Sequence, residues 1–533
     1  MKTVEQKKIE EIVHANDAYQ SLVFSRGFLI TTKKSIDLTE AVLTKLWRCS
    51  QIGSYNVWLH PETTYYIYTE KNVSLFLIGH AYNPFDHQYD ENDILCSLAT
   101  SYFQSLECFY EKTGELTGIF TIGVVDNDVL KIVPDAASMQ VVYWGVIDGA
   151  LFVTSHCNLV RSIVMLTRDP YVEELIHYKF YPLFGPVLPG DLSPYKELKR
   201  VQANFLYSFQ NQNLKFQRLF PTRKIQACKS EEECSDTIQK IGDILASNLT
   251  LIAKKWGKSA AISLTGGRDS TTTLAAAHKV YDSLGYFSYI SCEGEIPDAK
   301  AAHEISLNLG LQHNIYHIPV SSVKSQVLND YSAIIEYNMG NIGHLKDKDI
   351  CKRIYFHNCD DFKIEIKSWV DEIGRARYHK RYKKERFPNK PTPRYLTTMY
   401  KAFLGNRKLV KETDLVFKEY LEKYYKDPTF SLIPWWDLLY WEFSWGAGEA
   451  LALTSEHRLV YEVTIPFNCR KLLELMLSVP LHMRIEDRIQ VSIIQRLNPT
   501  IWESGTHVKD HGWTLKRELT ERIYLEIHSR LPF

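Results

Sequence analysis

The feature that most constrains the fold is a short turn at residues 264–270, with the sequence LTGGRDS. An apolar run, 260–262, precedes the turn and an alanine-rich segment, 271–277, follows it, a pattern that predicts a strand, a tight turn and a helix. Such a helix directs its unpaired N–H groups and its positive dipole end at the turn, and two adjacent glycines let a ligand approach the backbone closely. The turn therefore suits a phosphate or pyrophosphate group.

Asp269 is the most informative residue of this turn, because a carboxylate repels phosphate unless a divalent cation bridges the two. The turn is not a Walker loop, since it lacks the GxxxxGK[ST] pattern and contains no lysine. The alternative interpretation is a plain surface turn between a strand and a helix. The residues predicted to bind a nucleotide are Leu264, Thr265, Gly266, Gly267, Arg268, Asp269, Ser270 and Thr271.

Length and composition set the broad class of the protein. The 533 residues allow about two to four domains, and the contents of 45% apolar and 24% charged residues are usual for a globular protein. A net charge of zero provides no global field that favours nucleic acid or an acidic membrane. Because no apolar run reaches about 18 residues, no membrane span is predicted.

The cysteines favour a reducing compartment. Ten of them are scattered along the chain without a CxxC pair, which is typical of reduced thiols, and the N-terminus is polar and lacks an apolar signal core. We therefore expect a cytoplasmic protein. The alternative for two of these thiols is a metal site around His357, which lies between Cys351 and Cys359.

The first 225 residues contain β-branched and aromatic runs that predict antiparallel strands. Strands at 118–125 and 129–133 are expected to pair as a hairpin across a short acidic turn. Strands at 140–145 and 150–155 are expected to pair across an Asp-Gly turn. The first part of the chain is therefore predicted to be an antiparallel sandwich with a few helices.

The composition changes near residue 222, where a polar linker leads to a predicted helix with Ser230 as its N-cap and Glu233 at the capping-box position. Beyond this point strands and helices alternate, as in a parallel sheet covered on both faces. The expected elements are a strand at 287–291, a helix at about 298–309 ended by Gly310, and a strand at 313–318.

The chain is strongly helical after about residue 395. The predicted fold is an α+β N-terminal antiparallel β-sandwich, followed by an α/β parallel-sheet domain with a helical C-terminal part. The expected domains are residues 1–225 and residues 230–533.

The order of these features resembles the asparagine synthase family over most of the chain. The turn is similar to the SGGxDS pyrophosphate loop of N-type ATP pyrophosphatases, with Thr265 in place of the first serine. The stretch 295–310, followed by a strand that contains histidine, is similar to the segment that follows the second strand in that family. The stretch 460–468, VYEVTIPFN, resembles the family segment E-x-R-x-P-F-L-D.

The N-terminal half resembles a class II glutaminase domain through the stretches 114–120, 134–144 and 151–155. An active glutaminase of that class exposes a cysteine at position 2 after removal of methionine. Here position 2 is Lys2 and the first cysteine is Cys49. The resemblance therefore implies a glutaminase-like domain without glutaminase activity, as in β-lactam synthetases and some lasso peptide cyclases.

The second acidic motif of the family, S-G-x-G-x-D-E, is matched by a stretch in which Lys367 and Trp369 replace the two glycines. Asp371 is kept, and the resemblance implies that Asp371 and Asp269 hold Mg²⁺. Ser368 stands where asparagine synthetases carry a Glu and β-lactam synthetases a Tyr, and a serine is a poor general base without help. The alternative is that Asp371 and its neighbour simply cap a helix.

Glu462 is a candidate catalytic residue in an apolar stretch. A partly buried carboxylate there orients a catalytic group in one interpretation, and in the other it pairs with Arg458 or Arg470 to hold the fold.

Lys509 is the candidate for the lysine that stabilises the acyl-adenylate transition state in this family. It follows a stretch similar to the family's L-P-x-x-I segment, and Lys516 or Arg488 are the alternatives.

Residues 375–394 carry nine Lys or Arg residues and one Glu, interleaved with aromatic residues. One interpretation is a solvated basic loop. The other is a lid or docking surface for an anionic or carrier-borne substrate. Nucleic acid is a weaker alternative, because the chain as a whole carries no net charge.

Together these features predict an ATP-dependent amide-forming ligase that uses ATP and Mg²⁺. The resemblance implies that a substrate carboxylate attacks the α-phosphorus, releases pyrophosphate as an acyl-adenylate forms, and is then transferred to an amine. Departures from the asparagine pattern favour a specialised substrate in surface polysaccharide or natural-product biosynthesis. The alternatives are an RNA-modifying ATP pyrophosphatase and a non-catalytic binding protein derived from the family. A homodimer is compatible with the sequence.

Overall fold

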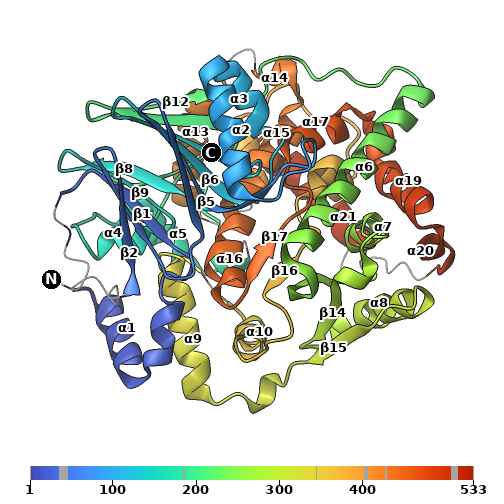
Figure 1. Ribbon diagram of the computed structural model, residues 1–533, viewed down its shortest axis with the longest axis horizontal. Coiled ribbons are helices and arrows are strands. Elements are labelled where there is room, and N and C mark those ends of the chain that lie inside the picture. Colours follow the sequence, from blue (N-terminus) through green and yellow to red (C-terminus); the bar gives the residue numbers. More distant parts are fainter. Residues whose placement is uncertain are drawn as a thin grey trace.

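The computed structural model describes residues 2–34, 36, 46–183, 187–343, 345–400, 406–426, 429–505 and 514–531. Within these ranges the chain forms two antiparallel sheets, one parallel sheet and a mainly helical C-terminal region, which confirms the predicted fold class (Figure 1). The antiparallel sheets come from the part of the chain coloured from blue to blue-green, and the parallel sheet comes from the later part, coloured from green to orange-red.

Both antiparallel sheets have six strands. The first has the order β10 (Lys199–Arg200), β8 (Tyr143–Ile147), β9 (Ala150–Thr154), β1 (Phe28–Thr31), β3 (Tyr55–Leu59), β2 (Arg48–Ile52). The second has the order β12 (Asn213–Arg218), β11 (Phe205–Gln210), β7 (Val129–Pro134), β6 (Thr117–Asp126), β5 (Val73–Tyr82), β4 (Tyr65–Glu70).

Strand β5 shows how the layers of the N-terminal half are built. Its residues Phe76 and Ile78 belong to the core that the two sheets share. Leu75 and Leu77 point the other way and pack with residues of α2 (Glu91–Gln104) and α3 (Leu106–Thr113). Because successive side chains of a strand face opposite sides, a strand covered on both faces is buried along almost its whole length, as β5 is.

The predicted hairpins are present. Asp126 pairs with Val129, and the two residues between them have positive φ, as a type I′ turn requires. Ile147 pairs with Ala150 in the same way, around Asp148 and Gly149. The strand expected at 140–145, however, begins only at Tyr143. The Asp135 carboxylate accepts the backbone N–H of Met139 and of Gln140, both at 2.8 Å, and this holds the preceding residues in a buried turn.

The parallel sheet has five strands in the order β15 (His313–His317), β14 (Gly285–Ile290), β13 (Ala260–Ser263), β16 (Ile364–Ile366), β17 (Glu462–Thr464). All of its pairings are parallel. Along the chain, β14 pairs with one side of β13 and β15 pairs with β14. Strand β16 then pairs with the other side of β13. The point between β13 and β16 is therefore a topological switch point, where ligands bind at the carboxyl ends of the strands in folds of this kind.

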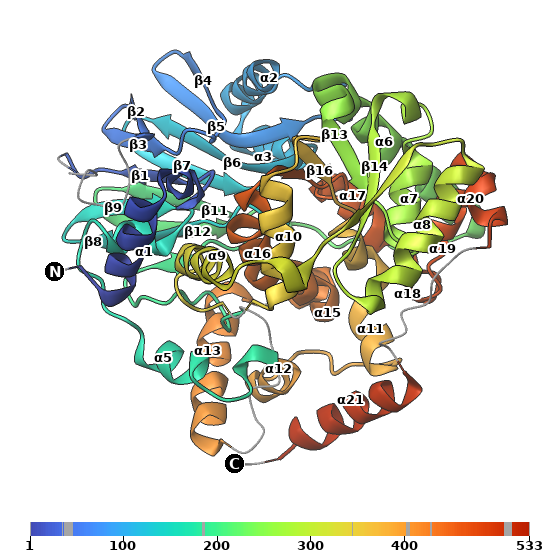
Figure 2. The same ribbon diagram turned by 90° about the horizontal axis from the view of Figure 1, so that it is seen from below.

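Helices pack around this sheet (Figure 2). Helix α6 (Glu231–Trp256) has Ser230 as its N-cap, and the Ser230 hydroxyl accepts the N–H of Glu233, as predicted. Helix α7 (Arg268–Ala276) contacts β13, and α8 (Ile296–Asn308) contacts β14 and β15.

The remaining long segments are helical. They are α1 (Val4–Ala15), α9 (Ser325–Asn338), α10 (Asp347–His357), α11 (Arg377–Tyr382), α12 (Pro393–Tyr400), α13 (Arg407–Tyr424), α15 (Trp435–Leu439), a π-helical segment (Tyr440–Glu449), α16 (Ala450–Ser455), α17 (Arg470–Ser478), α18 (Leu481–Ile485), α19 (Arg488–Leu497), α20 (Pro499–Glu503) and α21 (Leu515–His528). No helix among the described residues combines the length and apolar character needed to cross a membrane.

The two halves of the chain share one continuous core of buried apolar residues, which runs from Ile9 to Leu525. Polar contacts also cross between the halves. Asn468, which follows β17, accepts the N–H of Ala137 at 2.9 Å and donates to the Asp135 carboxylate at 2.9 Å. The division into residues 1–225 and 230–533 stays a prediction, because no gap in the core marks it.

All ten cysteines are free, in keeping with the predicted reduced thiols. Within the described ranges no group of His, Cys, Asp and Glu side chains forms a metal cluster, so the alternative of a site around His357 receives no support. The His357 ring instead hydrogen-bonds to Tyr331.

Candidate active site

The predicted nucleotide turn lies where the topology favours ligand binding. It continues from the carboxyl end of β13, and the segment that carries Ser368 and Asp371 continues from the carboxyl end of the adjacent β16. The strand register pairs Ile262 with Ile366, so both segments leave the sheet at the same level. Parallel pairing of two strands far apart in sequence therefore brings the two predicted acidic residues to one edge.

Hydroxyl groups inside the turn hold its shape. The Ser270 hydroxyl donates to the carbonyl of Thr265 at 2.9 Å, and the Thr265 hydroxyl accepts the N–H of Gly267 at 3.1 Å. The backbone of Gly267 is extended, with φ of −77°, so its angles do not require glycine. A Cβ atom there would lie 3.1 Å from the Thr265 hydroxyl oxygen, which is tighter than an ordinary contact.

Helix α7 starts directly after the turn without a side-chain cap. Its first intrahelical bond runs from the N–H of Thr271 to the carbonyl of Gly267. The N–H groups of Arg268, Asp269 and Ser270 therefore lie in the first turn, where no carbonyl of the helix can accept them. These groups and the helix dipole favour an anion at this position.

An anion already lies beside the turn. The N–H of Gly266 donates to the carboxylate of Asp298, in the first turn of α8, at 3.1 Å. The carboxylate of Glu295, just before it, accepts from Lys352 at 2.8 Å and from the N–H of Ser291 at 2.7 Å. Burial alone raises the pKa of Glu295, but these hydrogen bonds outweigh burial and lower it.

Asp269 meets a network of charged residues. Its carboxylate pairs with the guanidinium of Arg375, which also donates from Nε to Asp487 at 2.8 Å. Lys380 pairs with the same Asp487. Arg375 and Lys380 belong to the basic segment, so part of its charge is used to neutralise acidic residues next to the turn.

Asp371 is fully buried beside Asp269. One carboxylate oxygen accepts from Gln490 of α19 at 2.8 Å, and the other has no hydrogen-bond partner among the described residues. Burial and the nearby Asp269 carboxylate raise the pKa of Asp371 well above its usual range. Val370 precedes it with φ of +74°, a conformation that a β-branched residue rarely adopts, and such strain clusters at functional sites.

This arrangement fits a divalent cation. A buried carboxylate oxygen without a partner, next to a second carboxylate, is a place where positive charge is stabilising. No third acidic residue, histidine or cysteine of the described ranges completes a protein-only metal cluster. Mg²⁺ commonly binds through one or two carboxylates together with substrate phosphates and water, which matches this pair.

A cavity of about 290 Å³ opens at the switch point, and we call it the switch-point cavity. Its lining consists of Ser263, Leu264, Thr265, Asp269, Ser270, Ser288, Tyr289, Glu295, Asp298, Ala299, Lys367, Ser368 and Trp369. Four of the residues predicted to bind the nucleotide are among them. The cavity volume is close to the lower end of the range usual for small-molecule sites.

Lys367 is a cation of this cavity that the sequence analysis treated only as a replacement for a glycine. It is largely buried, pairs with the fully buried Glu365 at 3.0 Å, and lies over the ring of Trp369 at 4.8 Å. Two residues earlier on the chain, Glu365 lies within β16 and fixes the lysine beside the cavity. The alternation of Glu365 and Lys367 with isoleucines is the sequence pattern from which this pair could have been predicted.

Ser368 lines the same cavity, as predicted for a residue near the reacting groups. Its hydroxyl accepts a hydrogen bond from the hydroxyl of Thr273 at 2.7 Å. A hydroxyl bonded to another hydroxyl gains no basicity, so the catalytic role of Ser368 stays a prediction.

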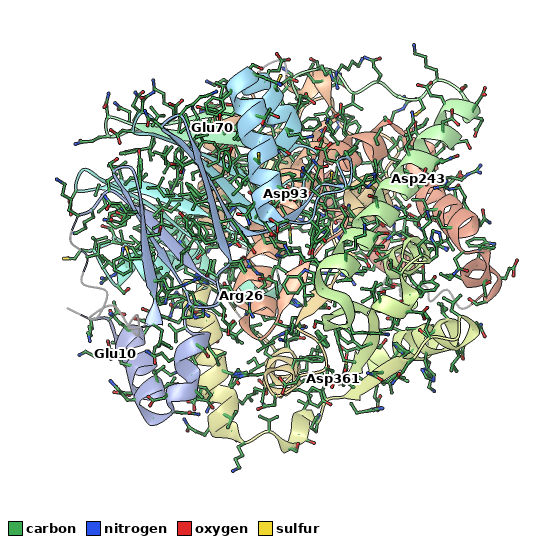
Figure 3. All side chains as sticks on the ribbon, in the orientation of Figure 1. Glu10, Arg26, Glu70, Asp93, Asp243 and Asp361 are labelled. Atoms are coloured by element: carbon green, nitrogen blue, oxygen red, sulfur yellow. The ribbon has the colours of Figure 1, made fainter. Side chains whose placement is uncertain are left out.

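Glu462 lies elsewhere. It begins β17, at the amino end of a parallel strand, whereas the turn lies at the carboxyl end of the sheet. Arg458 donates from Nε to its carboxylate at 2.6 Å, and Arg26, which precedes β1, lies 3.6 Å away (Figure 3). Of the two predicted partners the structure thus selects Arg458, while Arg470 donates to Asn204 instead. The contacts are those of an ion pair that holds the fold.

Replacing Glu462 with Gln is expected to lower the free energy of unfolding by roughly 2 kcal/mol at neutral pH. Burial alone would raise the pKa of Glu462, but Arg458, His80 and Arg26 outweigh it and lower the pKa to about 2. A carboxyl with a lowered pKa stabilises the fold above its ordinary pKa of 4.5 and loses that effect as the pH falls through about 2. Urea denaturation of both proteins over this pH range measures the difference, and a constant difference would contradict the ion-pair role.

Lys509 lies outside the described residues. Of its two alternatives, Lys516 is exposed on α21, and Arg488 lies 3.4 Å from the exposed Glu486. Neither of them lines the switch-point cavity.

The basic segment is not a solvated loop. At least seven of its nine cations pair with carboxylates of the described residues, and five of these carboxylates come from beyond residue 400 in the sequence. Lys383 and Lys384, for example, pair with Glu518 and Glu526 of α21. The segment thus ties C-terminal elements together, and its use as a docking surface stays a proposal.

Lys2 pairs with Glu10 of α1 at 2.6 Å, and Cys49 is exposed on β2 (Figure 3 labels Glu10). The predicted lack of glutaminase activity stays a prediction.

Comparisons with known proteins are weak. No family model matches the chain, and a search of curated proteins finds no match. The solved structures that match include a glutamine phosphoribosylpyrophosphate amidotransferase from B. subtilis in complex with ADP and GMP. It shares 11% identity, covers 52% of this chain and 62% of its own, and has a TM-score of 0.23.

Two further solved structures are similar at the same level. An allosteric regulatory enzyme of purine biosynthesis has 10% identity, coverage of 64% of this chain and 91% of its own, and a TM-score of 0.25. A glutamine-dependent NAD⁺ synthetase from Acinetobacter baumannii in complex with ADP has 11% identity, coverage of 43% and 51%, and a TM-score of 0.19. This chain spans less than two thirds of the first and third proteins. Scores this low carry no argument about function, so the proposal below depends on the geometry of the site.

Proposed function

We propose that the protein is an ATP-dependent ligase that joins a carboxylate to an amine and releases AMP and pyrophosphate. The observation that carries the proposal is the meeting of Asp269 and Asp371 at the switch point, beside a helix N-terminus. A phosphate-binding helix end alone has many uses. A helix end combined with two neighbouring carboxylates, one of which has an oxygen without a hydrogen-bond partner among the described residues, suits a nucleotide whose phosphates bind Mg²⁺.

Mg²⁺ held by Asp269 and Asp371 would neutralise charge on a departing pyrophosphate. The chain itself supplies the other contacts. The N–H groups at the start of α7 would bind phosphate oxygens, and Lys367 would stabilise negative charge at the reacting carboxylate. Glu295 and Asp298 also line the cavity, and carboxylates suit the hydroxyl donors of a ribose.

In the proposed reaction a carboxylate oxygen bonds to the α-phosphorus, and the bond from that phosphorus to the pyrophosphate breaks. An amine nitrogen then bonds to the acyl carbon, the carbon–oxygen bond to AMP breaks, and the nitrogen loses one proton. Both steps need the phosphates to be held while water is excluded. A cation held by Asp371 would be shielded from bulk water, because the side chain of Asp371 is fully buried.

Calorimetric titration of Mg-ATP into the wild type and the Asp269→Ala variant tests the nucleotide site. Binding is expected to require Mg²⁺ in the wild type and to weaken by at least about tenfold in the variant, since a charge-assisted contact is lost. Asp282→Ala, which removes an exposed carboxylate that does not line the cavity, is the matched control.

The same proteins should then be screened with candidate acids and amines for the nucleotide product. AMP and pyrophosphate are expected. ADP as the product would contradict attack on the α-phosphorus. Equal affinity of the wild type and the Asp269→Ala variant for Mg-ATP would contradict the assignment of the nucleotide site.

A further inference from the structure

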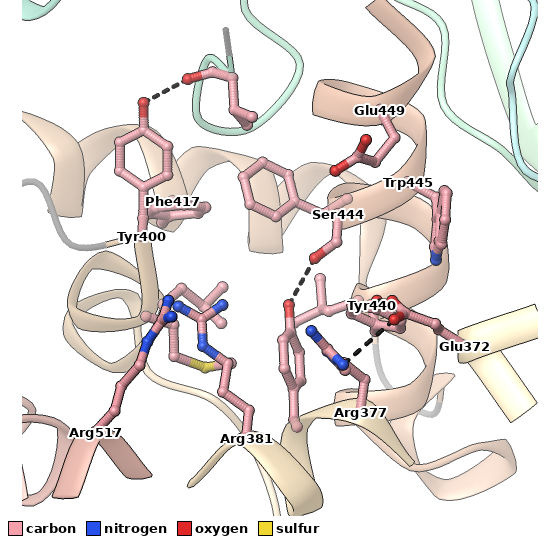
Figure 4. Close-up of a pocket in the computed structure, with 16 residues that line it drawn as sticks. Glu372, Arg377, Arg381, Tyr400, Phe417, Tyr440, Ser444, Trp445, Glu449 and Arg517 are labelled. Atoms are coloured by element: carbon pink, nitrogen blue, oxygen red, sulfur yellow. Dashed lines mark hydrogen bonds and ion pairs between the residues drawn. The ribbon is translucent and has the colours of Figure 1, made fainter. Parts of the chain in front are cut away.

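A second cavity adjoins the switch-point cavity, and we call it the arginine cavity (Figure 4). Its volume is about 390 Å³. The two cavities are neighbours because Trp445 of the second contacts Trp369 of the first, with ring centroids 5.9 Å apart. A ligand in the arginine cavity would therefore lie next to the proposed reaction site.

One end of the arginine cavity is positively charged. Arg381 of α11 and Arg517 of α21 both line it, and both approach the carboxylate of Glu521, at 2.8 Å and 3.7 Å. Figure 4 shows the two guanidinium groups at the same end of the cavity. Both guanidinium groups face the cavity, and the planar guanidinium of arginine suits carboxylates and phosphates.

The other end carries Glu449, the last residue of the π-helical segment. Its carboxylate is solvent-accessible within the cavity and has no hydrogen-bond partner among the described residues. Desolvation of the carboxylate within the cavity raises the pKa of Glu449 to about 7, and the nearby carboxylates of Glu372 and Glu456 add to this shift. A carboxylate in this setting is stabilised by a ligand that brings positive charge. Figure 4 shows Glu449 well separated from the arginine pair.

Glu372, the other carboxylate of the cavity, is satisfied by the protein. It accepts from the hydroxyl of Tyr440 and pairs with Arg377 at 3.3 Å. The contrast between Glu372 and Glu449 leaves Glu449 as the acidic group available to a ligand.

The walls between the two charged ends are largely apolar and aromatic. The residues that form them are Val187, Tyr378, Leu396, Met399, Tyr400, Phe417, Leu439, Tyr440, Phe443 and Trp445. An apolar linker between the charged groups of a ligand would be buried against these walls.

We propose that the arginine cavity binds the amine substrate, and that this substrate is a primary amine that also carries an anionic group, joined by an apolar linker. The anionic group lies at Arg381 and Arg517, and the ammonium group lies at Glu449, toward the switch-point cavity. This inference rests on the proposed ligase function, because it identifies the second substrate of the same reaction. Free ammonia would contact only the Glu449 end of the cavity and would make no use of the two arginines.

The test is calorimetric titration of a defined series of such amines into the full-length protein without nucleotide. The series consists of β-alanine, γ-aminobutyrate, ε-aminocaproate and para-(aminomethyl)benzoate, which differ in the separation of their charges. Benzylamine and para-methylbenzoate are matched controls that each lack one charged group. Arg381→Gln and Glu449→Gln remove one end of the cavity each. Arg522→Gln is the control variant, because Arg522 is exposed on the same helix as Arg517 and does not line the cavity.

At least one amine of the series, which carries both an ammonium and an anionic group, is expected to bind the wild type and the Arg522→Gln protein. Its affinity is expected to fall by about tenfold or more in each cavity variant. Benzylamine and para-methylbenzoate, which each carry only one charged group, are expected to bind the wild type at least about tenfold more weakly. Failure of the whole series to bind at millimolar concentration would overturn the proposal. Equal affinity of the wild type for ligands with one charged group and for ligands with two would also overturn it. This comparison uses the wild type alone, so it holds even if a variant does not fold.

The result is separable from the test of the nucleotide site. Mg-ATP binding without amine binding would remove the substrate assigned to the arginine cavity and leave the ligase proposal standing. Amine binding without Mg-ATP binding would contradict the nucleotide site and leave the ligand of the arginine cavity standing. The two results are independent because the titration of amines contains no nucleotide.

Discussion

Replacing Asp371 by Asn is expected to lower the rate of AMP formation by about a thousandfold, equivalent to about 4 kcal/mol. The substitution keeps the shape of the side chain and its contact with Gln490, but removes the negative charge proposed to hold the cation with Asp269. Loss of cation binding removes the neutralisation of the departing pyrophosphate, so the effect falls on the chemical step. The rate is measured with an acid identified by the product screen, at saturating Mg-ATP.

The same variant separates catalysis from folding. Burial and Asp269 raise the pKa of Asp371, so its ionised form destabilises the folded protein at pH values above the ordinary carboxyl pKa of 3.8. Neutral Asn removes that cost, and the Asp371→Asn protein is expected to melt at the same temperature as the wild type or at a higher one. Sites of this kind commonly sacrifice stability for function.

The control for this prediction is Asp360→Asn, which removes an exposed charge in the segment before β16. Titration with Mn²⁺, followed by the paramagnetic signal of the free ion, provides a readout that needs no acid substrate. An Asp371→Asn protein with the activity and Mn²⁺ affinity of the wild type would refute the assignment of Asp371 as a metal ligand.

Replacing Glu442 by Gln is expected to lower the free energy of unfolding by about 3 kcal/mol. Glu442 is fully buried in the π-helical segment, and its carboxylate accepts from Arg218 at 2.7 Å and 3.2 Å. Asn204 and Tyr425 donate to the same carboxylate at 3.0 Å and 2.7 Å. Without the charge of Glu442 the largely buried Arg218 would lack its counter-ion, and this is the main cause of the expected loss.

Urea denaturation measures the effect, and Glu422→Gln is the matched control. Glu422 lies 3.9 Å from Lys418 on the exposed face of α13, where an ion pair contributes about 0–1 kcal/mol. A loss of less than about 1 kcal/mol for Glu442→Gln would mean that water or a rearranged partner compensates Arg218. The two Glu→Gln changes thus compare the same chemistry at a buried and an exposed site.

Local features of the chain were predictable from the sequence. The turn before α7, the cap at Ser230 and the hairpin at Asp148 and Gly149 depend on neighbours within a few residues, and all are present. The strand expected at 140–145 begins late, because the Asp135 carboxylate holds a buried turn that has the same apolar pattern as a strand. Composition alone does not distinguish those two buried environments.

The site was predictable only in part. Asp269 could be recognised from its own turn, whereas Asp371 was linked to it through a family resemblance and is brought beside it by the pairing of β13 with β16. Arg375 and Asp487 escaped notice because their pairing joins residues that are far apart in the sequence. The basic segment was predicted as an accessible surface for the same reason, since the acidic residues that neutralise it lie mostly in later helices.

The single core that joins the two halves has a consequence for how such a chain can change over generations. A fragment that started at α6 would lose the partners of Asn468 and Glu442 and would expose apolar surface that β6 now covers beneath β17. Deleting the antiparallel sheets is therefore expected to destabilise the half that carries the proposed active site. Natural selection can retain such sheets as structural support for that half, whatever chemistry they perform themselves.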